Sequence, residues 1–163
     1  MQFQIAVGLA RLLKYFSESP LGSLVIRDFQ LIQFVTVNGD VKISDLDDVT
    51  NEENRCKSNS DCVIGSKTKN ISLSCINDTC AGYNERWNLY NLERFYLKEF
   101  LHIGAPQGVF EDLQKIKKKS ASFMYDASTL LSDLEHLLRK LRNGFGLGKR
   151  EIAMDYFCIK DGN

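Results

Sequence analysis

Several features that classify proteins are scarce or absent in this 163-residue sequence. It has two prolines and two histidines, and its 21 Lys and Arg residues balance its 21 Asp and Glu residues, so the net charge is zero. Without excess positive charge, the chain is not expected to bind nucleic acid by neutralising phosphates. No stretch approaches the roughly 20 apolar residues that span a bilayer, so no transmembrane segment is expected.

The N-terminal residues also lack a recognisable targeting signal. Residues 1–5 contain no basic segment, and Arg11 interrupts the apolar run early, whereas a signal peptide carries a basic segment followed by an apolar core. The length fits one domain with a sizeable core. If the protein is secreted, we expect this chain to be an incomplete gene product.

A β-hairpin is predicted around residues 33–44. Residues 33–37 and 41–44 are two short apolar runs with β-branched residues, and Asn38, Gly39 and Asp40 join them. Asn-Gly between such runs is a strong hairpin signal, because both central turn residues must take positive φ.

Acidic residues flank this hairpin on both sides. Asp28 precedes the first strand, and Asp45, Asp47 and Asp48 follow the second. A hairpin brings its outer ends together, so these carboxylates are expected at one edge. Oxygen ligands of this kind suit a hard cation such as Mg²⁺, which also accepts phosphate oxygens.

Four of the five cysteines lie in one polar stretch, residues 51–82, which has no hydrophobic periodicity. They are Cys56, Cys62, Cys75 and Cys80, and Cys158 is left over. The same stretch carries two glycosylation acceptors, Asn70 and Asn77. Together they indicate an oxidising compartment and two disulfides, with three possible connectivities. Zinc binding is the alternative, although the C-x5-C and C-x4-C spacings differ from the C-x2-4-C pairs that zinc favours.

The remaining sequence is predicted to be mostly helical. Apolar residues recur at helical spacing in four segments: 3–16, 84–101, 109–119 and 126–142. Segment 84–101 is apolar around most of its circumference, which is typical of a buried central helix. Asp126 is a plausible N-cap for the last helix. The predicted class is therefore mainly α with a small β-hairpin, that is, α+β.

Four motifs in order carry a family resemblance: DF-x-x-x-QFV, NGDVKISDLDD, the cysteine-bearing stretch and NERWNLYNLERF. They cover roughly residues 5–144. The chain resembles the C-terminal lobe of a protein kinase of the vertebrate lonesome kinase type, a secreted tyrosine kinase grouped with the FAM69-like proteins. The resemblance implies a kinase-like C-lobe over residues 1–148, with the catalytic loop and hairpin at 24–48, a cysteine-rich insert at 51–82, a helical part at 84–143 and a tail at 149–163.

The resemblance also implies roles for individual residues. Asp28 stands at the catalytic aspartate of the H-R-D-x-x-x-x-N loop, and Gln33 occupies the Asn place. Asp45 occupies the D-F-G aspartate, which holds Mg²⁺ (or Mn²⁺) on ATP, and Gln33 is the second expected metal ligand. Leu46 replaces Phe as an apolar plug, and Asp47 replaces Gly.

The implied function is phosphoryl transfer from ATP to protein hydroxyls, with tyrosine expected from the resemblance alone. Expected substrates are secreted or extracellular-matrix proteins, met in the Golgi lumen or outside the cell. The sequence has no glycine-rich G-x-G-x-x-G loop and no Val-Ala-Ile-Lys strand, so the N-lobe is expected to be a missing partner and the isolated chain inactive.

Two other readings remain open. A pseudokinase or secreted binding module would use the glycosylated cystine stretch as a contact surface, and Gln33 and Asp47 favour it. A cytosolic zinc protein is the third reading.

Overall fold

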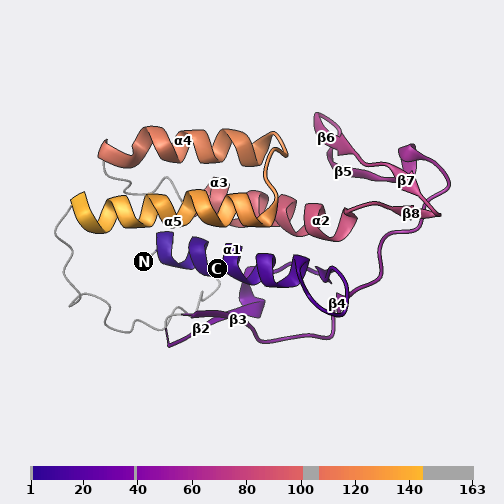
Figure 1. The fold of residues 1–163 in the computed structure, drawn as a ribbon, viewed down its shortest axis with the longest axis horizontal. Helices are drawn as coiled ribbons and strands as arrows, with labels where there is room; N and C mark the ends of the chain where they lie inside the picture. Colours follow the sequence, from indigo (N-terminus) through magenta and orange to yellow (C-terminus); the bar gives the residue numbers. More distant parts are fainter. Residues whose placement is uncertain (1, 39, 101–106, 145–163) are drawn as a thin grey trace, which may run out of the picture.

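The structure, a computed structural model, describes residues 2–38, 40–100 and 107–144 (Figure 1). Within these residues the protein is mainly helical, with four small antiparallel two-stranded sheets, so the predicted α+β class is confirmed. None of the helices in this part of the chain combines the length and the apolar character that crossing a bilayer demands. The expected tail, residues 149–163 with Cys158, lies outside the described residues.

The helices follow the predicted periodicity closely. They are α1 Gln2–Ser17, α2 Tyr83–Leu92, the π-helix Glu93–Leu97, α3 Lys98–Phe100, α4 Gln107–Ala121 and α5 Ala127–Gly144. The single helix predicted over residues 84–101 therefore contains a π-helical turn in its second half, and Leu101 is outside the described residues.

One apolar core holds the helices together. In Figure 1, α1 lies between α5 and the β2–β3 hairpin, and α4 lies along the other side of α5. The core is built from regularly spaced side chains of these helices that are almost fully buried, including Leu9, Leu13, Leu113, Leu130, Leu134 and Leu137. The leucine stripe of α5 is thus used for packing in the core.

The segment from residue 25 to residue 50 folds into two short sheets. Its elements are β1 Val25–Ile26, the 3-10 helix Leu31–Gln33, β2 Phe34–Val37, β3 Asp40–Ile43 and β4 Val49–Thr50. β2 pairs with β3 as predicted, and Asn38 has the positive φ of 53° that the turn requires. β1 pairs with β4, with Ile26 opposite Val49.

A close contact fixes the hairpin on α1. A Cβ atom placed on Gly8 would lie 2.4 Å from Val41 Cγ2. Val41 is buried against the helical core. Glycine at position 8 therefore lets the hairpin approach the helix backbone, which a larger side chain would prevent.

The cysteine-rich insert is more regular than predicted. It contains a 3-10 turn and two hairpins: Asn59–Asp61, β5 Val63–Ser66 with β6 Lys69–Ser72, and β7 Cys75–Ile76 with β8 Thr79–Cys80. These strands are two to four residues long, too short for periodicity to reveal. In Figure 1 the insert lies beyond the first turn of α2.

Two disulfides staple the insert. Cys56 pairs with Cys75, and Cys62 pairs with Cys80. This resolves the connectivity that the sequence left open. Because all four cysteines are oxidised in this structure, they supply no thiolates for zinc, which binds cysteine in the thiolate form.

Candidate active site

Two backbone hydrogen bonds define the candidate site. The Arg27 N–H donates to the Asp48 carbonyl at 2.9 Å, and the Ser44 N–H donates to the Gln33 carbonyl at 2.7 Å. Segments 28–32 and 45–47 are thus two loops tied to each other at both ends. Asp28 follows the first tie and Asp45 follows the second, so both residues belong to one loop pair but stand at its opposite ends.

Asp28 lies two residues after the end of the buried strand β1 but is itself exposed. Val25 and Ile26 have no exposed surface, which anchors the backbone on the N-terminal side of Asp28. Its carboxylate accepts a hydrogen bond from the Gln30 side-chain amide at 2.5 Å. An exposed, oriented carboxylate can accept a proton from a hydroxyl group that approaches from solvent.

Asp45 is also exposed, and its own loop orients it. Its Oδ1 accepts the Asp47 N–H at 3.0 Å. Within the described part of the chain its Oδ2 accepts no hydrogen bond, which fits the predicted role of Asp45 as a metal ligand. No three carboxylates of the described residues lie within 4.8 Å of one another, so no three of Asp28, Asp45, Asp47 and Asp48 form a compact metal-binding group, and a metal site here stays a prediction. Mg²⁺ usually takes one or two carboxylates together with phosphate oxygens and water.

Two neighbours of these aspartates differ from expectation. The Gln33 Oε1, the predicted metal ligand, accepts the Gln30 N–H at 3.3 Å, so this bond competes with metal binding. Leu46 is 63% exposed, so the prediction that it forms an apolar plug is wrong here. Its neighbours Asp45 and Asp47 are exposed as well, so this loop lies at the surface rather than against the core.

The strand that leads to Asp28 is held by polar side chains of α2. Asn88 is 1% exposed; its Oδ1 accepts the Ile26 N–H at 3.0 Å and its Nδ2 donates to the Leu24 carbonyl at 2.8 Å. Asn84 donates to the Ser23 carbonyl at 2.8 Å, and the Trp87 indole donates to the Ile26 carbonyl at 3.2 Å.

Residues 84–97 are buried or half-buried except Arg94, as expected of the buried central helix predicted over residues 84–101, but one buried face of α2 is polar rather than apolar. The fully buried positions of α2 are Asn84, Asn88, Asn91 and Leu92. The signal was present in the sequence, because Asn84, Asn88 and Asn91 recur at spacings of four and three, which place them on one helix face.

Arg27 connects this strand to the beginning of the insert. Its guanidinium donates to the Glu52 carbonyl at 2.7 Å. Nearby, burial raises the pKa of the Glu53 carboxyl above its ordinary value, and hydrogen bonds from the Asn84 and Tyr83 N–H groups and the charge of Arg27 oppose that shift. Burial likewise raises the pKa of the Tyr83 hydroxyl. The side chain of Arg27 is therefore directed towards the insert.

The predicted glycosylation acceptors are both accessible. Asn70 lies in β6 and is exposed, and its Nδ2 donates to the Ser66 carbonyl at 3.1 Å. Asn77 is exposed at the turn between β7 and β8, with a φ of 49°. Glycosylation of these two residues stays a prediction.

Comparison with known proteins gives one informative match. "Extracellular tyrosine-protein kinase PKDCC" from Homo sapiens is 35% identical to this chain over 163 residues, covering 98% of this chain and 33% of the human protein. The chain thus spans about a third of the length of the curated relative it matches. No family model matches the chain, and no solved structure matches it. The resemblance that the motifs indicate is confirmed: the chain is a relative of this kinase.

Proposed function

We propose that this chain, as a relative of a kinase named for its action on tyrosine outside the cell, contributes the catalytic loops of a protein kinase. The reaction is transfer of a phosphoryl group from ATP to hydroxyl groups of secreted or extracellular-matrix proteins, with tyrosine as the acceptor. The observation that supports this most is the loop pair, tied at both ends, that carries Asp28 and Asp45.

Each residue has a defined role in this proposal. Asp28 orients the substrate hydroxyl and accepts its proton as the phosphoryl group arrives. Asp45 would hold a divalent cation, and Gln33 would add an amide oxygen after its bond to the Gln30 N–H opens. A cation bound there would supply charge neutralisation for the phosphates of ATP.

Binding of ATP requires residues that this sequence does not contain. The glycine-rich loop and the strand lysine that hold ATP in kinases are absent from it. We infer that an N-lobe supplies them, and that the isolated chain has no measurable turnover. The disulfides and the accessible Asn70 and Asn77 fit a protein that works in the Golgi lumen or outside the cell.

The test uses a form of the protein that includes an ATP-binding lobe. Asp28→Asn and Asp45→Asn should each lower kcat for phosphorylation of a tyrosine peptide, by about 10²-fold or more for the proton acceptor. Asp40→Asn is the matched control, because Asp40 is an exposed aspartate at the other end of the hairpin. Equal activity of all three variants would exclude the proposed roles.

A pseudokinase or secreted binding module is the second candidate. The engaged Oε1 of Gln33 and the exposed Leu46 favour it, since both depart from what metal-assisted transfer needs. A thermal shift with Mg²⁺-ATP, measured on the form that includes an ATP-binding lobe, separates the two functions. Stabilisation that Asp45→Asn abolishes supports the kinase, and no shift in the wild-type protein supports the binding module.

A further inference from the structure

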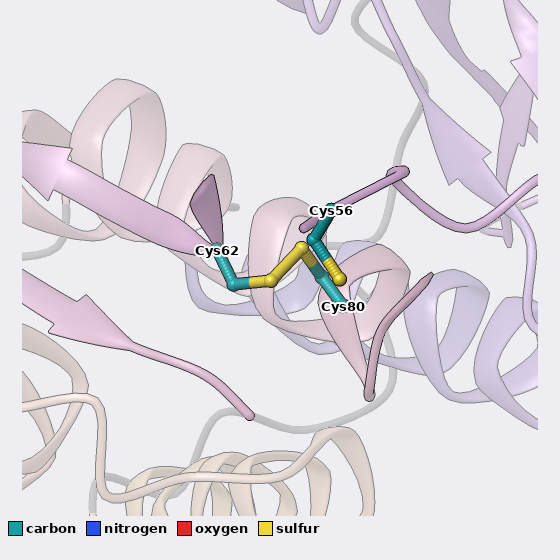
Figure 2. A group of neighbouring side chains, drawn as sticks. All are labelled: Cys56, Cys62 and Cys80. Carbon is teal, nitrogen blue, oxygen red and sulfur yellow. A yellow bond between two sulfur atoms is a disulfide. The ribbon is translucent and has the colours of Figure 1, made fainter. Parts of the chain in front are cut away.

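The two disulfides of the insert lie unusually close to each other. The Sγ atoms of Cys56, Cys62 and Cys80 are all within 4.8 Å of one another, although Cys56 belongs to one bridge and the other two form the second. Figure 2 shows the sulfur of Cys56 beside the bond between Cys62 and Cys80. A thiolate at Cys56 would therefore be in position to approach the second bridge.

The fourth cysteine also has an alternative partner. Cys75 and Cys80 are directly opposite each other in the β7–β8 hairpin. Their N–H groups bond elsewhere, to the Asn59 side chain and the Asn54 carbonyl. They are thus a non-hydrogen-bonded pair, whose Cα atoms lie about 4.5 Å apart with side chains on one face. That separation is within the range that a disulfide spans.

We propose that these four cysteines form an exchangeable pair of disulfides, with Cys75 as the site where an external thiol enters. The alternative pairing is Cys56 with Cys62 and Cys75 with Cys80. Cys75 is the entry site because it is half-buried, whereas Cys56, Cys62 and Cys80 are at most 7% exposed.

The exchange is balanced and needs no net oxidant. The thiolate of a small thiol or a disulfide isomerase attacks Cys75 Sγ, forms a mixed disulfide and releases the Cys56 thiolate. Cys56 then attacks Cys62 Sγ and releases the Cys80 thiolate, beside which Asn54 Nδ2 lies at 4.0 Å as a hydrogen-bond donor. Cys80 finally attacks Cys75 Sγ and regenerates the external thiolate. Two disulfides are present before and after.

The exchange would change how the insert is anchored. The present bridges join residues 56–62 to residues 75–80, whereas the alternative bridges close each of these segments on itself. Residues 54–56 bond to residues 78–80, through Cys56 N–H to Asp78 O at 3.0 Å and Cys80 N–H to Asn54 O at 2.8 Å. Glu52, just before them, accepts the hydrogen bond of Arg27. If the proposed kinase function holds, the exchange regulates the loop that carries Asp28.

The first test maps the disulfides directly and does not depend on kinase activity. The secreted protein with Cys158→Ser, which removes the fifth cysteine, is incubated with a catalytic amount of reduced glutathione, then acid-quenched and alkylated. After removal of N-glycans, trypsin cleaves at Lys57 and an Asp-specific protease cleaves at Asp78, so both pairings give distinct peptides. We expect gain of the 56–62 and 75–80 peptides with matching loss of the original pair. Persistence of the original pair alone overturns the proposal.

A variant traps the intermediate. In Cys75→Ser, the Cys56 thiol is free beside the second bridge, so we expect it to form a disulfide with Cys62 or Cys80 without added thiol. Both variants also carry Cys158→Ser, so the matched control, Cys56→Ser with Cys75→Ser, has no internal thiol and should keep the Cys62–Cys80 bridge. Full alkylation of Cys56 with an intact Cys62–Cys80 bridge in Cys75→Ser would contradict the proposal.

Discussion

The helical body and the cysteine-rich insert are stabilised by different means. The body buries a continuous cluster of apolar side chains from α1, α2, α4 and α5. The insert, residues 51–82, has a small cluster of its own, centred on Cys56, Cys62 and Cys80, with Leu73 and Tyr83 against it. The body is therefore sensitive to loss of side-chain volume, and the insert is sensitive to the redox state of its cysteines.

The candidate active site lies between these two regions. Asn88 of α2 holds the strand before Asp28 from the side of the body. Glu52, at the start of the insert, holds Arg27 from the other side. The loop pair is therefore held by both regions, and the predictions below disrupt each region separately.

The largest expected effect comes from the core of the body. Leu134→Ala should lower the free energy of unfolding by about 2–5 kcal/mol, because Leu134 is 1% exposed and its removal leaves a cavity. Chemical denaturation followed by circular dichroism measures it. Leu131→Ala, at a half-buried position of the same helix, is the control, and an equal loss there would show that the stripe of α5 is not the core.

Removal of one bridge should affect mainly the insert. Replacing Cys62 and Cys80 together by Ala should destabilise it by about 2–4 kcal/mol in the chain-entropy account. Limited proteolysis should then cut within residues 57–79, while the helical signal at 222 nm is retained. Loss of that helical signal would mean that body and insert do not fold separately.

The connection between body and site can be tested at Asn88. Asn88→Leu leaves the Ile26 N–H and the Leu24 carbonyl without their partners, which costs about 1–3 kcal/mol. Hydrogen exchange should show faster exchange of the Ile26 amide. Asn91→Leu is the matched control, because Asn91 is buried on the same face and donates to the Trp87 carbonyl of its own helix, not to the strand before Asp28. Faster exchange at Ile26 in both variants would argue against a specific role of Asn88.

The smallest effect is expected at the N-terminus of α5. Asp126 Oδ1 accepts the Thr129 N–H at 2.7 Å, and this bond and the one from the Thr129 hydroxyl hold the pKa of Asp126 below its ordinary value of 3.8. Asp126→Ala should cost about 0.5–2 kcal/mol at neutral pH.

The pH dependence gives this last prediction its sign. A lowered pKa means that the ionised carboxylate stabilises the folded state above pH 3.8, and the benefit is lost as the pH falls through the lowered pKa. The wild type and Asp126→Ala should therefore converge in stability in strong acid. Asp126→Asn, which keeps a capping oxygen, should lose less than Asp126→Ala at neutral pH, and a constant gap at all pH values would contradict the explanation.

Prediction from sequence succeeded where one residue pattern has one physical meaning. Leucines at helical spacing can bury a stripe only as a helix, so α1, α4 and α5 were located within about two residues. Asn38-Gly39 specified the hairpin because few other dipeptides allow positive φ in succession. The short strands of the insert were missed because two to four residues are too few for alternation to be recognised.

The candidate site was only partly predictable. The order Asp28, Gln33, Asp45 is visible in the sequence and indicates a relative of kinases. Gln30 makes two local contacts that no motif revealed. Its side-chain amide donates to the Asp28 carboxylate, and its backbone N–H donates to the Gln33 side chain. The exposure of Leu46 was likewise not predictable, because it depends on whether another segment of the fold packs against that side chain.

The sequence by itself determined the helices, the hairpin turn, the acidic residues beside it and the relationship to an extracellular kinase. These follow from local patterns, because periodicity and turn chemistry act between residues close in the chain. Only the tertiary structure decided the pairing of the cysteines and the use of the α2 asparagines to hold the strand before Asp28. Those contacts join residues about 18 to 64 positions apart, and such pairings depend on how the whole chain packs.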